Sequence, residues 1–194
     1  SGQIIDGVAK RHLVPFGEYA PFRSIIPFVD AIAGPHDFSP GSAAQSVKIP
    51  YAHNSSIENS TVKALTLICY EVIFPAAVRQ SARKDNVNFM ITITNDAWFG
   101  NTIGPRQHLA MAQMRSAELG LPMLRSANTG ISALIDGRGK IVKSLEYGRA
   151  GVVDGKLPSS FDTVYRQFGD LGYLLMMLVF LLLPLCLRLT RAKP

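Results

Sequence analysis

The sequence predicts an α/β fold, and three observations carry that prediction. Two short apolar runs rich in β-branched residues, at 62–69 and 89–94, are each followed by a segment of helical character. Two later runs flank the turn sequence Asp-Gly-Arg-Gly at 136–139. Alternation of strand and helix favours a parallel or mixed sheet, and a hairpin adds an antiparallel extension to it.

The first half of this pattern is the clearest. Residues 62–69 (VKALTLIC) are almost continuously apolar, which suits a strand buried on both faces. Residues 75–84 begin with a proline, which is favoured in the first turn of a helix. Residues 89–94 predict a second buried strand, and residues 105–119 predict a longer helix that ends before Gly120.

The second half is expected to hold shorter strands. Residues 131–136 (ISALID) and 140–145 (KIVKSL) form the predicted hairpin, and residues 150–157 (AGVVDGKL) are a further strand candidate. The polar stretch 51–61 is expected to be a loop. Residues 1–168 therefore fit one domain by length.

An uncharged apolar run from residue 171 to residue 187 follows this domain. As a helix it would extend about 26 Å, slightly less than a hydrocarbon core of about 30 Å, and flanking residues could lengthen it. We therefore predict a transmembrane helix at 169–189 and a basic tail at 190–194. The alternative is a buried core helix that contains Pro184.

The charges near the C-terminus predict an orientation. The chain has 20 Lys and Arg against 14 Asp and Glu, a net charge of +6, and three of the cations follow the apolar run. Positive residues flank the cytoplasmic end of membrane helices, so we expect a cytoplasmic C-terminus and a domain on the opposite side. Because so much of the excess charge lies in the tail, it argues against a nucleic-acid-binding face.

Composition and residue spacing argue against three other classes. With 47% hydrophobic and 18% charged residues, the chain can supply a folded core and is not expected to be disordered. Its two cysteines cannot form a disulfide framework, and its four histidines have no cysteine or histidine partner at zinc-ligand spacing. The sequence predicts neither a metal nor a cofactor.

Polar residues gather at three places where chemistry could occur. Cys69, Tyr70 and Glu71 follow the first buried strand, where catalytic groups collect in α/β sheets. A second group lies at 10–19 (KRHLVPFGEY), and a third at 94–100 (TNDAWFG) contains the only tryptophan. The plainer alternatives are an inert core cysteine, a solvated turn and an aromatic lid on the core. The buried carboxylate of Glu71 needs a partner, and a cation is the natural one.

Four motifs in this order resemble the carbon–nitrogen hydrolase (nitrilase) superfamily. They are KRHLVPFGEY, LICYEVIFP, TNDAWFG and RSANTGISALID, and the resemblance covers nearly all of residues 1–165. It implies a nitrilase-like αββα sandwich, of which this chain holds the C-terminal portion. The spelling of the motifs and the terminal apolar run resemble the membrane-bound N-acyltransferases that complete the maturation of bacterial lipoproteins.

The resemblance implies a Glu-Lys-Cys triad. In this sequence Cys69 would be the nucleophile, and Lys10 would stabilise the tetrahedral intermediate together with the backbone N–H of Tyr70. Glu18 would orient Lys10, and Tyr70 and Glu71 would line the site. A lysine ammonium beside a thiol favours the thiolate, and it also stabilises the oxyanion formed in acyl transfer.

Further residues would shape the site. Asn95, Trp98 and Phe99 would line the acyl or acceptor pocket, and residues 125–132 would support it from an adjacent strand. The glutamate that acts as general base in the superfamily lies well before the lysine, whereas only Asp6 precedes Lys10 as a carboxylate. We therefore expect the base on an upstream segment or a separate chain, and this chain alone to be inactive.

The implied reaction has two substrates. Cys69 would take an acyl chain from a membrane phospholipid and pass it to the N-terminal amine of a diacylglyceryl apolipoprotein. The implied location is the bacterial inner membrane, with the catalytic domain on the periplasmic side. An apolar stripe at 22–32 would form a lid or lipid entrance, or would pack on the core. The alternatives are a membrane-tethered amidase that uses water as acceptor, and a non-catalytic binding module in which Cys69 is inert.

Overall fold

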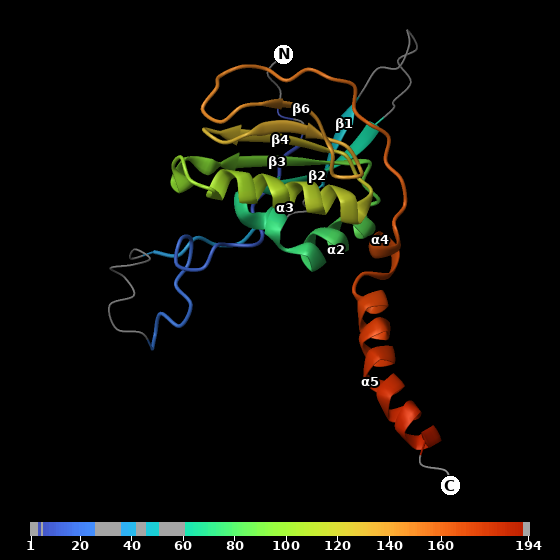
Figure 1. Ribbon diagram of the computed structural model, residues 1–194. Coiled ribbons are helices and arrows are strands. Elements are labelled where there is room, and N and C mark those ends of the chain that lie inside the picture. Colours follow the sequence, from blue (N-terminus) through green and yellow to red (C-terminus); the bar gives the residue numbers. More distant parts are fainter. Residues whose placement is uncertain (1–3, 5, 26–35, 42–45, 51–60, 192–194) are drawn as a thin grey trace.

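The computed structural model describes residues 4, 6–25, 36–41, 46–50 and 61–191, and of residues 184–191 only the backbone. Its centre is one six-stranded sheet in the order β1-β2-β3-β4-β5-β6, with two helices packed on it (Figure 1). The elements are β1 (Ser46–Pro50), β2 (Thr61–Ile68), the 3-10 helix η1 (Cys69–Ile73), α2 (Pro75–Asp85), β3 (Phe89–Asn95), the 3-10 helix η2 (Asp96–Phe99), α3 (Gly104–Leu119), β4 (Met123–Asn128), β5 (Ser132–Ile135), β6 (Ile141–Leu145), α4 (Val164–Phe168) and α5 (Leu171–Arg191).

The sheet is mixed, as the sequence predicts. Strands β2, β3 and β4 are parallel, and β1 and the β5–β6 hairpin extend the sheet at its two sides in antiparallel pairing. The three parallel strands end together, because Ile68 pairs with Ile93 and Asn95 pairs with Asn128. Every segment that follows these strands therefore starts at the same edge of the sheet.

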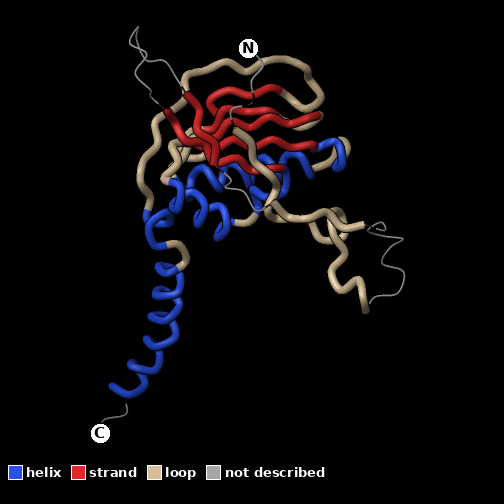
Figure 2. Tube along the Cα trace, turned by 180° about the vertical axis from the view of Figure 1, so that it is seen from behind, coloured by secondary structure: helices blue, strands red, loops and turns tan. Residues whose placement is uncertain are grey.

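Helices α2 and α3 connect the parallel strands, and both cover the same face of the sheet (Figures 1 and 2). The hydrophobic core lies between these two helices and the sheet. Buried apolar side chains of the sheet meet those of the two helices there, among them Leu65, Leu67, Met90, Val78 and Leu109. Gly120 ends α3 in the left-handed conformation, with a φ of 63°, as the sequence predicts.

The prediction of a strand at 150–157 is wrong. This segment has no strand or helix structure and is mostly exposed, with Val152 at 83%. It lies against the β5–β6 hairpin without pairing with it: Gly155 packs against the side chain of Leu134, and the ammonium of Lys143 donates to the carbonyl of Asp154 at 2.7 Å. Two glycines weaken the strand preference of this apolar stretch.

The predicted loop at 51–61 lies outside the described residues except for Thr61, which begins β2. Of the apolar stripe predicted at 22–32, only residues 22–25 are described. They form turns, and Phe22 has a φ of 59°, which lies outside the right-handed helical region. Phe22 and Ile25 are 70% and 74% exposed, so these two side chains do not pack on the core.

The short helix α4 is anchored to α2 before the chain enters α5. The guanidinium of Arg79 donates to the carbonyls of Tyr165 at 2.8 Å and Gln167 at 2.6 Å, and Arg83 donates to Gln167 at 2.7 Å. Cationic side chains at the last carbonyls of a helix also interact favourably with its dipole.

Helix α5 leaves the domain and extends alone (Figure 1). Residues 171–183 are all exposed, and most of them are large and apolar. Among the residues that the structure describes, none of the helices is both long and apolar enough to cross a membrane, so the predicted transmembrane helix at 169–189 is not confirmed.

Candidate active site

Cys69 lies where the first parallel strand turns sharply into η1. It has a φ of 55°, in the left-handed region that non-glycine residues seldom occupy. Such a conformation costs on the order of 1–3 kcal/mol and persists only where the surroundings hold it. The turn brings a half-buried thiol to the edge where the three parallel strands end.

The carboxylate of Glu71 holds this turn against the loop that carries Lys10. One oxygen accepts from the backbone N–H groups of Arg11 at 2.8 Å and His12 at 3.0 Å, and the other accepts from Ile68 at 2.7 Å. Glu71 is 2% exposed, so these charge-assisted bonds lie out of solvent. These three partners are all backbone N–H groups. Glu71 therefore lies behind the cavity and joins two segments that are 60 residues apart.

Lys10 and Glu18 form an ion pair within the loop that Glu71 holds. The Lys10 ammonium is 2.6 Å from Glu18 Oε1, and the other oxygen of Glu18 accepts from the backbone N–H of Val14 at 2.8 Å. The side chain of Lys10 is only 13% exposed. Glu18 thus holds the Lys10 ammonium and closes the loop between the two residues.

A cavity of about 400 Å³ opens beside Cys69. Its walls are largely apolar, and it gathers residues from the Lys10 loop, η1, β3 and η2. They are Val14, Gly17, Glu18, Cys69, Tyr70, Asn95, Trp98 and Phe99. The structure therefore brings most of the predicted site residues together around one cavity, with Lys10 held at its edge through Glu18.

Asn95 and Trp98 form contrasting parts of this wall. The side-chain oxygen of Asn95 accepts from the backbone N–H of Ala97 at 3.2 Å and from Asn128 at 3.1 Å, which caps η2 and ties it to β4. Trp98 is 86% exposed, so it does not act as a lid on the core. It is available to contact a bound molecule.

A buried polar cluster lies next to the cavity, and one of its members, His108, belongs to no motif that the sequence singles out. Asp96, at the start of η2, accepts from Arg125 Nη2 at 2.7 Å and contacts His108 Nδ1 at 2.8 Å. Thr94 donates to the same carboxylate at 3.1 Å. Arg125, from the predicted supporting segment, also donates to the carbonyl of Ile131 at 3.2 Å.

The charges of this cluster depend on one another. Burial raises the pKa of Asp96, but the hydrogen bond from His108 and the charge of Arg125 outweigh it and hold that pKa below its usual value. Burial lowers the pKa of Arg125, while Asp96 and, more weakly, Cys69 raise it. The guanidinium is therefore within electrostatic reach of the cysteine.

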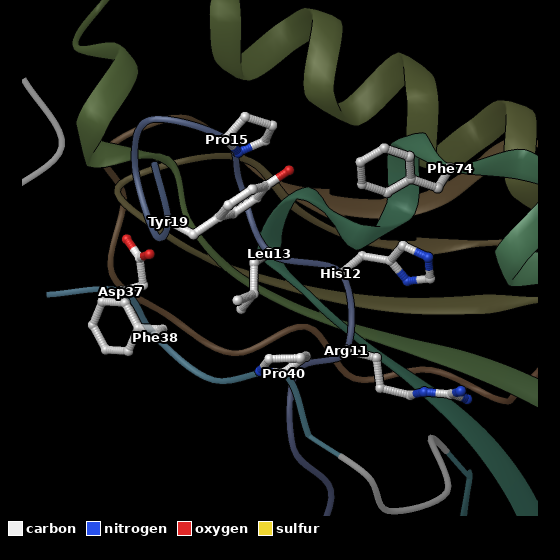
Figure 3. A pocket seen from close by; sticks show the side chains of 9 residues that line it. All are labelled: Arg11, His12, Leu13, Pro15, Tyr19, Asp37, Phe38, Pro40 and Phe74. Carbon is white, nitrogen blue, oxygen red and sulfur yellow. The ribbon is translucent and has the colours of Figure 1, made fainter. Parts of the chain in front are cut away.

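A second cavity, of about 550 Å³, opens beside the same loop (Figure 3). The ring of His12 lies against that of Phe74, with centroids 5.2 Å apart. The lining residues are Arg11, His12, Leu13, Pro15, Tyr19, Asp37, Phe38, Pro40 and Phe74. None of the predicted catalytic residues lines it, so the cavity at Cys69 is the candidate active site.

The cavity thus combines a cysteine with a carboxylate that is ion-paired to a lysine, and a family profile shows which family the chain belongs to. The profile of the carbon-nitrogen hydrolases matches residues 1–166. The chain belongs to the carbon–nitrogen hydrolase family. The α/β fold agrees with this membership, and the resemblance inferred from the four motifs is confirmed.

Within this family, the chain is similar to proteins named apolipoprotein N-acyltransferase. The chain is 38% identical over its whole length to the apolipoprotein N-acyltransferase of Bradyrhizobium diazoefficiens, and covers 35% of it. It is 40% identical to the enzyme of the same name from Rickettsia prowazekii, over 93% of this chain and 34% of that protein. The chain thus spans about a third of the length of these relatives.

Solved structures add no finer assignment. The chain is similar to Saccharomyces cerevisiae Nit3, a member of branch 10 of the nitrilase superfamily, with 23% identity and a TM-score of 0.45. That similarity covers 61% of this chain and 42% of Nit3.

Proposed function

We propose that the chain is the C-terminal part of a membrane-bound N-acyltransferase that transfers a fatty acyl chain from a phospholipid to an apolipoprotein. One observation carries the proposal: Cys69, in a strained turn, lines the same largely apolar cavity as Glu18, and Glu18 is ion-paired with Lys10. The names of relatives that match the chain along its whole length support an N-acyltransferase.

The first step forms an acyl-enzyme. The Cys69 thiolate attacks the ester carbonyl of the phospholipid, and negative charge develops on the carbonyl oxygen. The Lys10 ammonium and the backbone N–H of Tyr70 stabilise that oxyanion. The ester C–O bond then breaks, the lysophospholipid alkoxide takes a proton, and a thioester remains on Cys69.

The second step transfers the acyl chain. The N-terminal α-amine of the diacylglyceryl cysteine attacks the thioester, the C–S bond breaks, and the amine gives up a proton as the amide forms. A thioester reacts more readily with amines than an ester does, so the covalent intermediate divides one difficult step into two easier ones.

The proton transfers require a general base that we place on an upstream segment of the same enzyme. Of the candidate site residues, Glu18 is engaged with Lys10 and Val14, and Glu71 with backbone N–H groups. Neither carboxylate is disposed to accept a proton from the thiol. We therefore propose that this chain alone is inactive.

Both substrates are lipids, and two parts of the chain suit a bilayer surface. Helix α5 carries exposed apolar side chains along residues 171–183, and it continues to Arg191. Phe22, Ile25 and Phe38 are exposed. They belong to an arm, residues 13–25 and 36–41, that extends to the same side of the sheet as α5 (Figures 1 and 2). We propose that α5 enters the inner membrane with its C-terminus cytoplasmic, and that the arm contacts lipid beside the periplasmic domain.

The fate of the acyl-enzyme tests the proposal. The full-length protein is loaded with acyl phospholipid, freed of excess donor, and divided between buffer and a diacylglyceryl lipopeptide. For a transferase the acyl-enzyme persists in buffer and is discharged by the lipopeptide amine. Rapid loss to water would instead identify an amidase or hydrolase that shares the triad. Retained activity in Cys69→Ala or Lys10→Ala would leave only a non-catalytic role for these residues.

A further inference from the structure

The buried cluster of Asp96, His108 and Arg125 lies against the wall of the acyl cavity. The three side chains are 0%, 3% and 3% exposed and come from η2, α3 and β4. The ring of His108 is 6.1 Å from that of Tyr70 and 6.0 Å from that of Phe99, measured between centroids. Tyr70 and Phe99 both line the cavity with Cys69. His108 is therefore the element of the cluster that contacts the wall.

The hydrogen bonds fix the orientation of the His108 ring. An ionised Asp96 can only accept, so the proton of the 2.8 Å contact is on His108 Nδ1. Asp96 is itself held by Arg125 at 2.7 Å and by Thr94 at 3.1 Å. A ring held in this way cannot turn without leaving a buried carboxylate short of a donor, which is costly.

Helix α3 supports the same wall at its first residue. A Cβ on Gly104 would lie 2.8 Å from the Cβ of Phe99, so the backbone of the helix packs directly on that side chain. Phe99 meets His108 edge-on, with an interplanar angle of 65°, a favourable arrangement for aromatic rings. Phe99 is thus held by two positions of α3, one turn apart.

A buried ion pair is weak evidence of a role in stability, since apolar residues of similar volume often serve as well. We propose that His108 is a positioning residue: oriented by Asp96 and Arg125, it holds Tyr70 and Phe99 so that the cavity presents the acyl chain of the donor to Cys69. This inference rests on the proposed acyl transfer. It means that His108, a residue of α3, affects how tightly the acyl donor binds.

The test compares donor binding in His108→Asn with wild type, using the full-length protein in mixed micelles. The donors are dimyristoyl and dioleoyl phosphatidylethanolamine, and the acceptor is a diacylglyceryl lipopeptide. Asparagine keeps an N–H donor near the position of Nδ1 but removes the ring. We expect the KM for the donor to rise about fivefold, the size expected for one aromatic contact, with a smaller change in kcat and a weaker preference between the two donors.

Two further variants separate positioning from stability. His108→Phe keeps a ring beside Tyr70 and Phe99, so its KM rises less than that of His108→Asn. Leu109→Ala removes a core side chain from the same helix, so it lowers the melting temperature and leaves the KM unchanged. If His108→Asn does not fold, His108→Gln, which fills more of the space, is measured in its place.

A His108→Asn protein that melts earlier but keeps the wild-type KM and donor preference would overturn the inference. If wild-type protein acylates Cys69 and only this KM is unchanged, the inference alone fails. If the wild type forms no acyl-enzyme, the proposed function fails and the inference with it.

Discussion

The carboxylate of Glu71 should contribute a large share of the stability of the active-site region. It accepts three backbone hydrogen bonds, from Arg11, His12 and Ile68, at 2.7–3.0 Å. Hydrogen bonds to charged groups contribute about 1.5–3 kcal/mol each, and burial makes the loss of a partner costly. Glu71→Gln keeps one acceptor oxygen but turns an amide N–H₂ toward the N–H of one partner.

We therefore expect Glu71→Gln to lower the free energy of unfolding by about 2 kcal/mol and Glu71→Ala by about 4 kcal/mol. Equilibrium urea unfolding in mild detergent, followed by circular dichroism, measures both changes. Asp154→Asn, the same change at an exposed position, is the matched control. The reasoning is refuted if Glu71→Gln unfolds within about 0.5 kcal/mol of the wild type, the usual range of a surface substitution.

The remaining predictions concern the buried cluster. Burial raises the pKa of Asp96, but His108 and Arg125 lower it below the usual value, so its ionised form stabilises the fold above the unfolded pKa of about 3.9. That contribution is lost as the pH falls through the lower folded pKa, so the melting temperatures of wild type and Asp96→Asn should converge below about pH 4. Gly130→Ala should lower the free energy of unfolding by about 2 kcal/mol, because the added Cβ would overlap the Asp96 carboxylate. Gly7→Ala, where a Cβ meets open space, should not.

The elements that the sequence predicts correctly are those fixed by local patterns. The apolar run at 62–69 corresponds to β2. Pro75 marks the first residue of α2, as predicted. The predicted hairpin forms between β5 and β6. Asp136 stabilises its turn, because its side chain accepts from the backbone N–H groups of Arg138 and Lys140. The segment 150–157 forms no strand, because its two glycines weaken the strand preference of the apolar residues around them.

The site is predictable only where its contacts are local or belong to a motif. Lys10 and Glu18 are eight residues apart in one loop, and the structure joins them. The backbone partners of Glu71 depend on a loop 60 residues away, which no local pattern reveals. His108 likewise cannot be identified from the sequence, because only the packing of α3 against η2 brings it to Asp96.

The most direct test of the proposed function is the mass of the peptide that contains Cys69 after the full-length protein has been incubated with phosphatidylethanolamine. The account predicts an increase equal to one acyl group on this peptide, absent from Cys69→Ala and removed when a diacylglyceryl lipopeptide is added. An active protein in which this peptide never gains an acyl group, or a Cys69→Ala variant that still acylates the lipopeptide, would contradict it.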